Sequence, residues 1–130
     1  MASERSNQHW IETYKSLITL SIEGFKFAAL ANGGAAVALL AYLGNVTGKG
    51  VCAPDMRWAM AAFLVGLIAC GCSMLFGYLT QLKLLNESRG CEYPKLTHGY
   101  LLWFAIFMFA CSLVAFGIGS WQAVVGFRVI

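Results

Sequence analysis

Four polar side chains near the N-terminus are spaced so that they could line a water-filled path. Glu12, Ser16, Thr19 and Glu23 recur at intervals of three and four residues, which places them on one stripe of a helix. Rings of such groups from several subunits form the mouths of ion pores. Glu23 would then stand at the mouth of an oligomeric pore. A solvated face on a helix beside a membrane gives the same pattern, so both interpretations stay open.

Lys26 and Asn32 continue the polar sequence toward an apolar segment. Lys26 can pair locally with Glu23, three residues earlier, and both can snorkel to the interface. Ionisable groups near hydrocarbon are costly and are therefore functional candidates. Asn32 follows Glu23 by nine residues, about 180° around an ideal helix. The two could line one narrow pore only if the helix were interrupted, for instance at Gly33-Gly34.

The amide of Asn32 has two possible roles. A buried amide in a membrane helix usually hydrogen-bonds across a helix interface. It can also face a lumen, and the sequence leaves both open.

Three uncharged segments are the elements that must position these residues. Residues 27–48, 58–82 and 96–127 hold 22, 25 and 32 positions without a formal charge, and all 15 Asp, Glu, Lys and Arg residues lie elsewhere. About 20 apolar helical residues cross a bilayer's hydrocarbon core. With 12% charged residues and a mean hydropathy of +0.69, the chain is predicted to be an all-α integral membrane protein with three spans.

Capping signals set the expected boundaries. Gly44-Asn45 should end the first helix, Asp55 should cap the second, Gly90 should close it, and Thr97 should cap the third. The first two helices would then exceed the membrane thickness and project together into the cytoplasm. The expected layout is a juxtamembrane helix at 4–22, spans at 23–44, 57–80 and 97–124, an outer loop at 45–56, a cytoplasmic extension and loop at 81–96, and a tail at 125–130.

The basic residues predict the orientation. The N-terminus and second loop carry six Lys or Arg residues, and the first loop and C-terminus carry three. The positive-inside rule therefore places the N-terminus in the cytoplasm and the C-terminus outside. The ten N-terminal residues lack a cationic segment followed by an apolar core, so we expect no signal peptide.

Small residues recur four apart along the spans. Such rows let membrane helices approach closely, and there are more of them than one three-helix bundle can use. We therefore expect a homo-oligomer. The packing candidates are Gly33, Gly34, Ala38, Gly66, Cys70, Ser73, Gly77, Ala115 and Gly119.

Several chemistries find no support. The two histidines, His9 and His98, are not at one depth as a membrane haem requires, and no carboxylate pair, nucleophile–base pattern or His/Cys cluster occurs. We expect no enzyme activity, cofactor or metal. The net charge of +3 is small and dispersed, so no nucleic-acid partner is expected. The five cysteines suit packing, although Cys52 could pair with its copy in a neighbouring subunit if its loop faces an oxidising compartment.

The stretch HWIETYKSLI at 9–18, followed by LANGGAAVALLAYLGN at 30–45, resembles a group of uncharacterised small bacterial inner-membrane proteins. The resemblance covers the first 45 residues and implies a bacterial inner-membrane location but no activity. In size and layout the chain is also similar to compact membrane effectors of bacterial antiviral defence systems. Phage holins are similar in their short multi-span chains, but the charged tail common among them is missing here.

Two functions compete on this basis. The first is a homo-oligomeric channel or pore-forming membrane effector, which rests on the polar stripe, the small-residue rows and Asn32. The second is a non-conducting anchor or adaptor whose cytoplasmic helices bind a soluble partner. A holin-like, membrane-permeabilising role is a third possibility.

Overall fold

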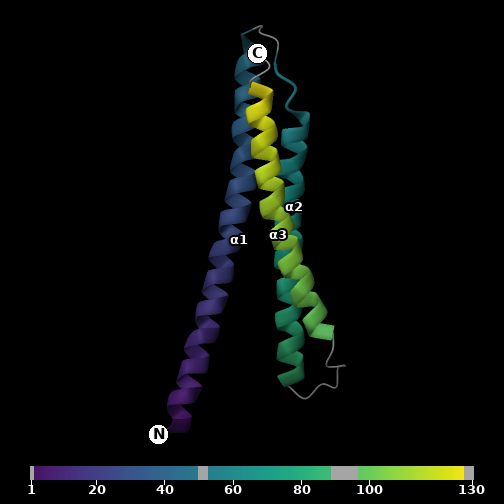
Figure 1. The fold of residues 1–130 in the computed structure, drawn as a ribbon. Coiled ribbons are helices and arrows are strands. Elements are labelled where there is room, and N and C mark those ends of the chain that lie inside the picture. The colour runs from purple at the N-terminus through teal and green to yellow at the C-terminus, as the bar shows by residue number, and fades with distance from the viewer. Residues whose placement is uncertain (1, 50–52, 89–96, 128–130) are drawn as a thin grey trace.

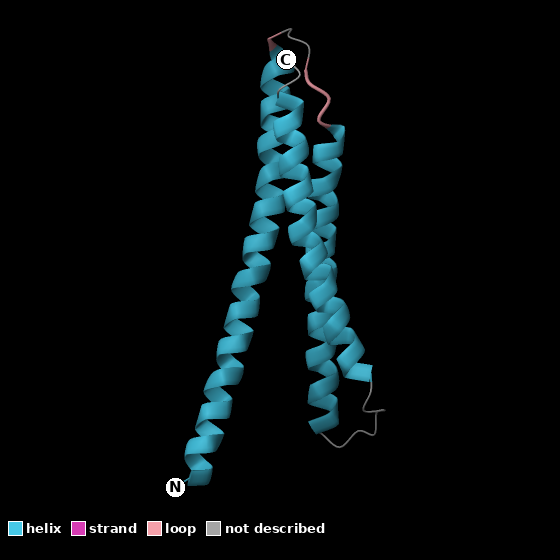
Figure 2. Cartoon of the chain, in the orientation of Figure 1, coloured by secondary structure: helices cyan, strands magenta, loops and turns pink. Residues whose placement is uncertain are grey.

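The computed structural model is all-helical, with three helices and no sheet in the part of the chain that it describes (Figures 1 and 2). It describes residues 2–49, 53–88 and 97–127, with the side chains of 8–49, 53–86 and 99–127. The helices are α1 (Ala2–Gly48), α2 (Arg57–Ser88) and α3 (Thr97–Phe127). All three are long and apolar enough to cross a membrane, which is compatible with a small membrane protein.

The helices are longer than a bilayer requires. At 1.5 Å per residue the 47 residues of α1 extend about 70 Å, more than twice the hydrocarbon thickness of about 30 Å. α2 has 32 residues and α3 has 31, so each extends nearly 50 Å. The excess of α1 lies toward its N-terminus, where the charged side chains of this helix gather.

The first helix continues through Gly44 and Asn45, where the sequence suggested its end, to Gly48. Gly44 does not adopt the left-handed conformation of a helix cap. Thr47 Oγ1 donates to the carbonyl oxygen of Leu43 at 2.8 Å, a bond along the helix. These residue types tolerate a helix end but do not impose one.

The start of α2 is capped by Asp55. Its Oδ1 accepts the backbone N–H of Arg57 at 3.2 Å, which satisfies one of the N–H groups that a helix start leaves unpaired. The Met60 N–H bonds the Met56 carbonyl at 3.0 Å and begins the regular ladder. Asp55 therefore bonds the start of the helix as predicted, but from one residue before Met56, whose carbonyl accepts the first helical bond.

The three helices run alternately up and down (Figure 1). The end of α1, the start of α2 and the end of α3 lie together at one end of the bundle, called here the α1–α2 end. The start of α1 lies at the other end. α2 and α3 form the closest pair, and α1 packs on them near the α1–α2 end and diverges toward its N-terminus. The core cluster lies where all three meet and contains Ala36, Leu39, Met56, Ala59 and Phe63.

Glycine and aromatic side chains determine how closely the helices approach. A Cβ on Gly119 would lie 2.8 Å from Phe63 Cε1, so the Phe63 ring of α2 packs directly on the α3 backbone. Edge-on ring pairs join Phe76 to Phe104, with centroids 4.5 Å apart, and Tyr42 to Phe127, at 4.9 Å. Such ring pairs stabilise a fold by about 0.5–1.5 kcal/mol beyond the free energy gained by burying their surface area.

The outer surface of the bundle is mostly apolar. Leu30 and Trp103 are exposed by 74% and 72% in the single chain, and many other aliphatic side chains of all three helices are exposed as well. A patch of this extent on a soluble monomer would cause association. On membrane helices it suits contact with lipid tails.

Some residues with predicted roles lie outside the described part of the chain. They are Gly90, the cysteines Cys52 and Cys91, the side chains of Thr97 and His98, and, among the basic residues counted for the orientation, Arg89, Lys95, Arg128 and the side chain of Arg5.

Candidate functional site

Asn32 is the most deeply buried polar residue of α1, with no exposed surface. Its Nδ2 donates to the carbonyl oxygen of Ala28, one turn earlier, at 3.0 Å. The same nitrogen lies 3.3 Å from the carbonyl oxygen of Ser112 and 3.2 Å from Ser112 Oγ. Asn32 therefore ties α1 to α3 in the middle of the bundle.

Asn32 of α1 and Ser112 of α3 also meet α2, at Gly66. A Cβ built on Gly66 would lie 2.6 Å from Asn32 Cγ and 3.0 Å from Nδ2, and would overlap Oδ1. Real Cβ atoms do not approach so closely, so only glycine fits at this position. Asn32, Gly66 and Ser112, one from each helix, are called here the polar junction.

The polar junction leaves one acceptor without a conventional hydrogen bond. Among the described residues no group donates to Asn32 Oδ1, which is buried. Turning the amide over would place this oxygen against the Ala28 and Ser112 carbonyls, so the two carbonyls determine its orientation. Instead Oδ1 faces the Gly66 Cα–H, which can offer a weak C–H···O contact. An unpaired buried acceptor costs about 1–3 kcal/mol.

Two further polar contacts join the helices on the N-terminal side of the polar junction. Ser73 Oγ donates to the Ala105 carbonyl oxygen at 2.6 Å, between α2 and α3. Cys70 Sγ lies 3.6 Å from the Phe25 carbonyl oxygen, between α2 and α1. Both side chains are almost fully buried. These contacts hold the three helices in one register, because each side chain reaches a particular carbonyl.

The polar stripe of α1 lies elsewhere. Glu12, Ser16, Thr19 and Glu23 are all exposed, and Glu23 pairs with Lys26 at 2.8 Å on the surface of the same helix. The helix is not interrupted at Gly33-Gly34, so Glu23 stays about 180° from Asn32. Since Asn32 faces α2 and α3, the stripe faces away from them. The structure therefore does not bring the stripe and Asn32 together.

The small residues separate into two groups. Gly66, Cys70, Ser73, Ala115 and Gly119 are buried between helices. Gly33 is half-buried, with Leu67 of α2 3.9 Å from where its Cβ would be. Gly34 and Ala38 are exposed, and a Cβ on Gly34 or on the half-buried Gly77 would meet no atom within 4 Å. Gly34 and Ala38 thus remain unpartnered on α1.

Sequence reasoning did not single out Ser112 or Gln81. Ser112 stands one residue after Cys111, and a hydroxyl in the middle of an apolar span was the available signal. Gln81 Oε1 accepts the Tyr14 hydroxyl at 2.7 Å, the contact that links the diverging part of α1 to α2. The spacing of 67 residues gives no local signal for it.

Within the described residues no group of three or more His, Cys, Asp or Glu side chains could hold a metal ion. No protein-family model, curated protein or solved structure matches the chain. Its function is therefore inferred from the geometry of the three helices.

Proposed function

We propose that this chain is a small inner-membrane protein that self-associates into a channel or pore-forming effector, with the outer face of α1 toward the other copies. One observation carries the proposal. The polar stripe of α1 is exposed and faces away from α2 and α3, while the polar junction occupies the inner face. Polar side chains at the end of a membrane helix suit water better than lipid.

The same face continues along α1 into small residues. Gly34 follows Glu23 by eleven residues, about 20° around the helix from it. Gly34 and the neighbouring Ala38 are exposed, and small exposed residues permit close approach of another membrane helix. Copies that packed through these residues would bring their polar stripes near one axis, with the N-termini in the cytoplasm by the positive-inside rule.

Asn32 has a structural role in this arrangement. Because its side chain is buried among α1, α2 and α3, it would support the fold of each copy. The candidates that would meet water in a lumen are Glu12, Ser16, Thr19 and Glu23, with Lys26 paired to Glu23 at the edge.

The mass of the particle in lipid nanodiscs tests self-association first. A ring of four or more copies supports the proposal, whereas a monomer or dimer has too few helices to enclose an aqueous path and would overturn it. Ion flux in liposomes then tests the stripe. Glu23→Gln should lower the preference for cations about fivefold. The reason is that a carboxylate attracts a cation 4 Å away in water by about 1 kcal/mol, and the amide lacks this charge. Ser21→Ala, exposed on another face of the same turn, is the matched control and should leave the flux unchanged.

A second candidate function is a non-conducting anchor. It is favoured by the exposure of every side chain from 8 to 23, which leaves the surface of this arm accessible to a soluble partner. In this case Glu12→Lys should abolish recovery of one specific partner in a pull-down while the particle mass stays unchanged. Recovery of no specific partner by the wild type would count against the anchor.

A further inference from the structure

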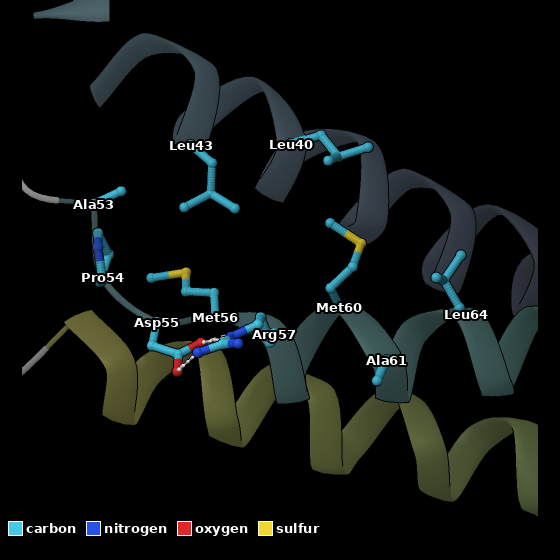
Figure 3. Close-up of a pocket in the computed structure, with 10 residues that line it drawn as sticks. All are labelled: Leu40, Leu43, Ala53, Pro54, Asp55, Met56, Arg57, Met60, Ala61 and Leu64. Atoms are coloured by element: carbon cyan, nitrogen blue, oxygen red, sulfur yellow. Dashed lines mark hydrogen bonds and ion pairs between the residues drawn. The ribbon is translucent and has the colours of Figure 1, made fainter. Parts of the chain in front are cut away.

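A groove opens between α1 and α2 at the α1–α2 end of the bundle (Figure 3). Its volume is about 560 Å³, within the range of small-molecule sites. One side is open to the surroundings. The groove is lined by Leu40, Leu43, Ala53, Pro54, Asp55, Met56, Arg57, Met60, Ala61 and Leu64.

The walls of the groove are apolar and adaptable. Leu43 of α1 points toward Met56, and Met60 of α2 points toward α1, where Leu40 lies (Figure 3). Methionine side chains are flexible and polarisable, so they fit chains of variable shape. These walls suit a hydrocarbon chain.

The rim of the groove carries one cation and one anion. Arg57 Nε lies 3.0 Å from Asp55 Oδ1, and Nη2 lies 3.1 Å from Oδ2. The side-chain hydrogen bond from Arg57, with its backbone N–H, holds the pKa of Asp55 below the ordinary value. The guanidinium uses two of its five N–H donors on this carboxylate, which leaves donors for a phosphate. Oδ2 keeps acceptor capacity for another donor.

The order of polar and apolar groups matches the depth profile of a lipid leaflet. Asp55 and Arg57 precede the uncharged segment 58–82, and the exposed Trp58 beside them is typical of the membrane interface. Leu64 lies seven residues further along α2, about 10 Å deeper. The charged rim is thus at head-group level, and the apolar walls are at acyl-chain level.

We propose that this groove binds a phospholipid whose head group carries both a phosphate and a primary ammonium. The phosphate contacts Arg57, the ammonium donates to Asp55, and one acyl chain lies between Leu40 and Met60. A phosphate without an ammonium would meet the Asp55 carboxylate at close range and be repelled. A quaternary ammonium cannot donate a hydrogen bond to Asp55. Charge complementarity therefore disfavours the anionic lipid, and the hydrogen bond to Asp55 favours the primary over the quaternary ammonium.

Native mass spectrometry of the full chain tests this proposal. The protein is released from nanodiscs of equal parts phosphatidylethanolamine, phosphatidylcholine and phosphatidylglycerol, and retained lipid is counted per protomer. Phosphatidylethanolamine should dominate. Arg57→Gln should lower its retention about tenfold, as expected for loss of a charge-assisted hydrogen bond. Asp55→Asn, which keeps a good helix cap, should remove the preference for phosphatidylethanolamine over phosphatidylglycerol.

Two controls keep the result interpretable. Lys15→Gln removes the same charge from an exposed site on α1 and should leave retention unchanged. Met60→Trp fills the groove without touching the rim and should also reduce retention. Equal retention of the three lipids by the wild type would overturn the proposal. So would unchanged retention of phosphatidylethanolamine in Arg57→Gln, or in Met60→Trp. Neither result depends on whether the protein conducts ions.

Discussion

Asn32 Nδ2 lies 3.2 Å from Ser112 Oγ, a contact that joins α1 to α3 across 80 residues of sequence. It is formed inside the bundle, where neither side chain has any exposed surface. Hydrogen bonds between membrane helices average about 0.6 kcal/mol. The contact is therefore modest in free energy, but it fixes which face of α1 is inside. That choice determines that Glu23 and its neighbours face outward.

Gly66→Ala should destabilise the bundle by about 1–3 kcal/mol, because the new methyl group overlaps the Asn32 amide. The measurement is the free energy of unfolding in mixed micelles titrated with sodium dodecyl sulfate. Gly71→Ala is the matched control on the same helix, since a Cβ there meets no atom within 4 Å. Equal effects of the two substitutions would show that Gly66 does not contact the Asn32 side-chain amide in the folded protein.

Asn32→Ala should rescue Gly66→Ala. The side-chain atoms that a Cβ on Gly66 would meet are Oδ1, Cγ and Nδ2 of Asn32, and the alanine lacks all three. In the Asn32→Ala background, Gly66→Ala should therefore lose most of its destabilising effect. The coupling energy comes from a double-mutant cycle in the same micelles. Strictly additive effects would contradict the contact.

Tyr14→Phe should loosen the N-terminal part of α1 while the bundle stays folded. The change removes the hydroxyl that donates to Gln81 Oε1 at 2.7 Å. One such bond stabilises by about 0.5–1.5 kcal/mol, so the population of separated arms should rise several-fold. The distance distribution between spin labels at Leu17→Cys and Leu84→Cys, with the native cysteines replaced, should broaden toward longer values. Tyr78→Phe, at another exposed tyrosine, should leave the distribution as it is.

The pKa of Asp55 should lie below its ordinary value of 3.8. A lowered pKa means that the folded state binds the proton more weakly than the unfolded state. The ion pair with Arg57 therefore stabilises the fold above pH 3.8, and this contribution is lost as pH falls through the folded pKa. Carbon-13 chemical shifts of the carboxyl group measure the pKa directly. Arg57→Gln should return it toward 3.8, and an unchanged pKa in that variant would exclude Arg57 as the cause.

The helices could be predicted from the sequence because bilayer thickness fixes a minimum length for each apolar segment. The cap at Asp55 could be predicted as well, since it depends on residues two apart. The end of α1 could not, because Gly44 and Asn45 permit a helix end without imposing one. Where residues merely tolerate a helix end, packing and the next residues along the chain decide whether the helix stops.

Which face of α1 lies inside the bundle could not be predicted from the local sequence. The opposition of Glu23 and Asn32 results from helix geometry, but which of the two faces inward depends on Gly66 and Ser112, remote in the sequence. Gly34 and Gly66 both belong to small-residue rows, yet only Gly66 is buried within the chain. The same pattern serves contacts inside one chain and contacts between chains.

The distance along the chain between Asn32 and Ser112 also sets an order of events during synthesis. Ribosomes add about 5–20 residues per second, so the 80 residues from Gly33 to Ser112 take about 4–16 s at that rate. Throughout this interval α1 lacks its hydrogen-bond partner on α3. Insertion of α1 into the bilayer and its docking are thus separate steps in time. The bundle is completed only when its last helix is made, because Ser112 lies on that helix.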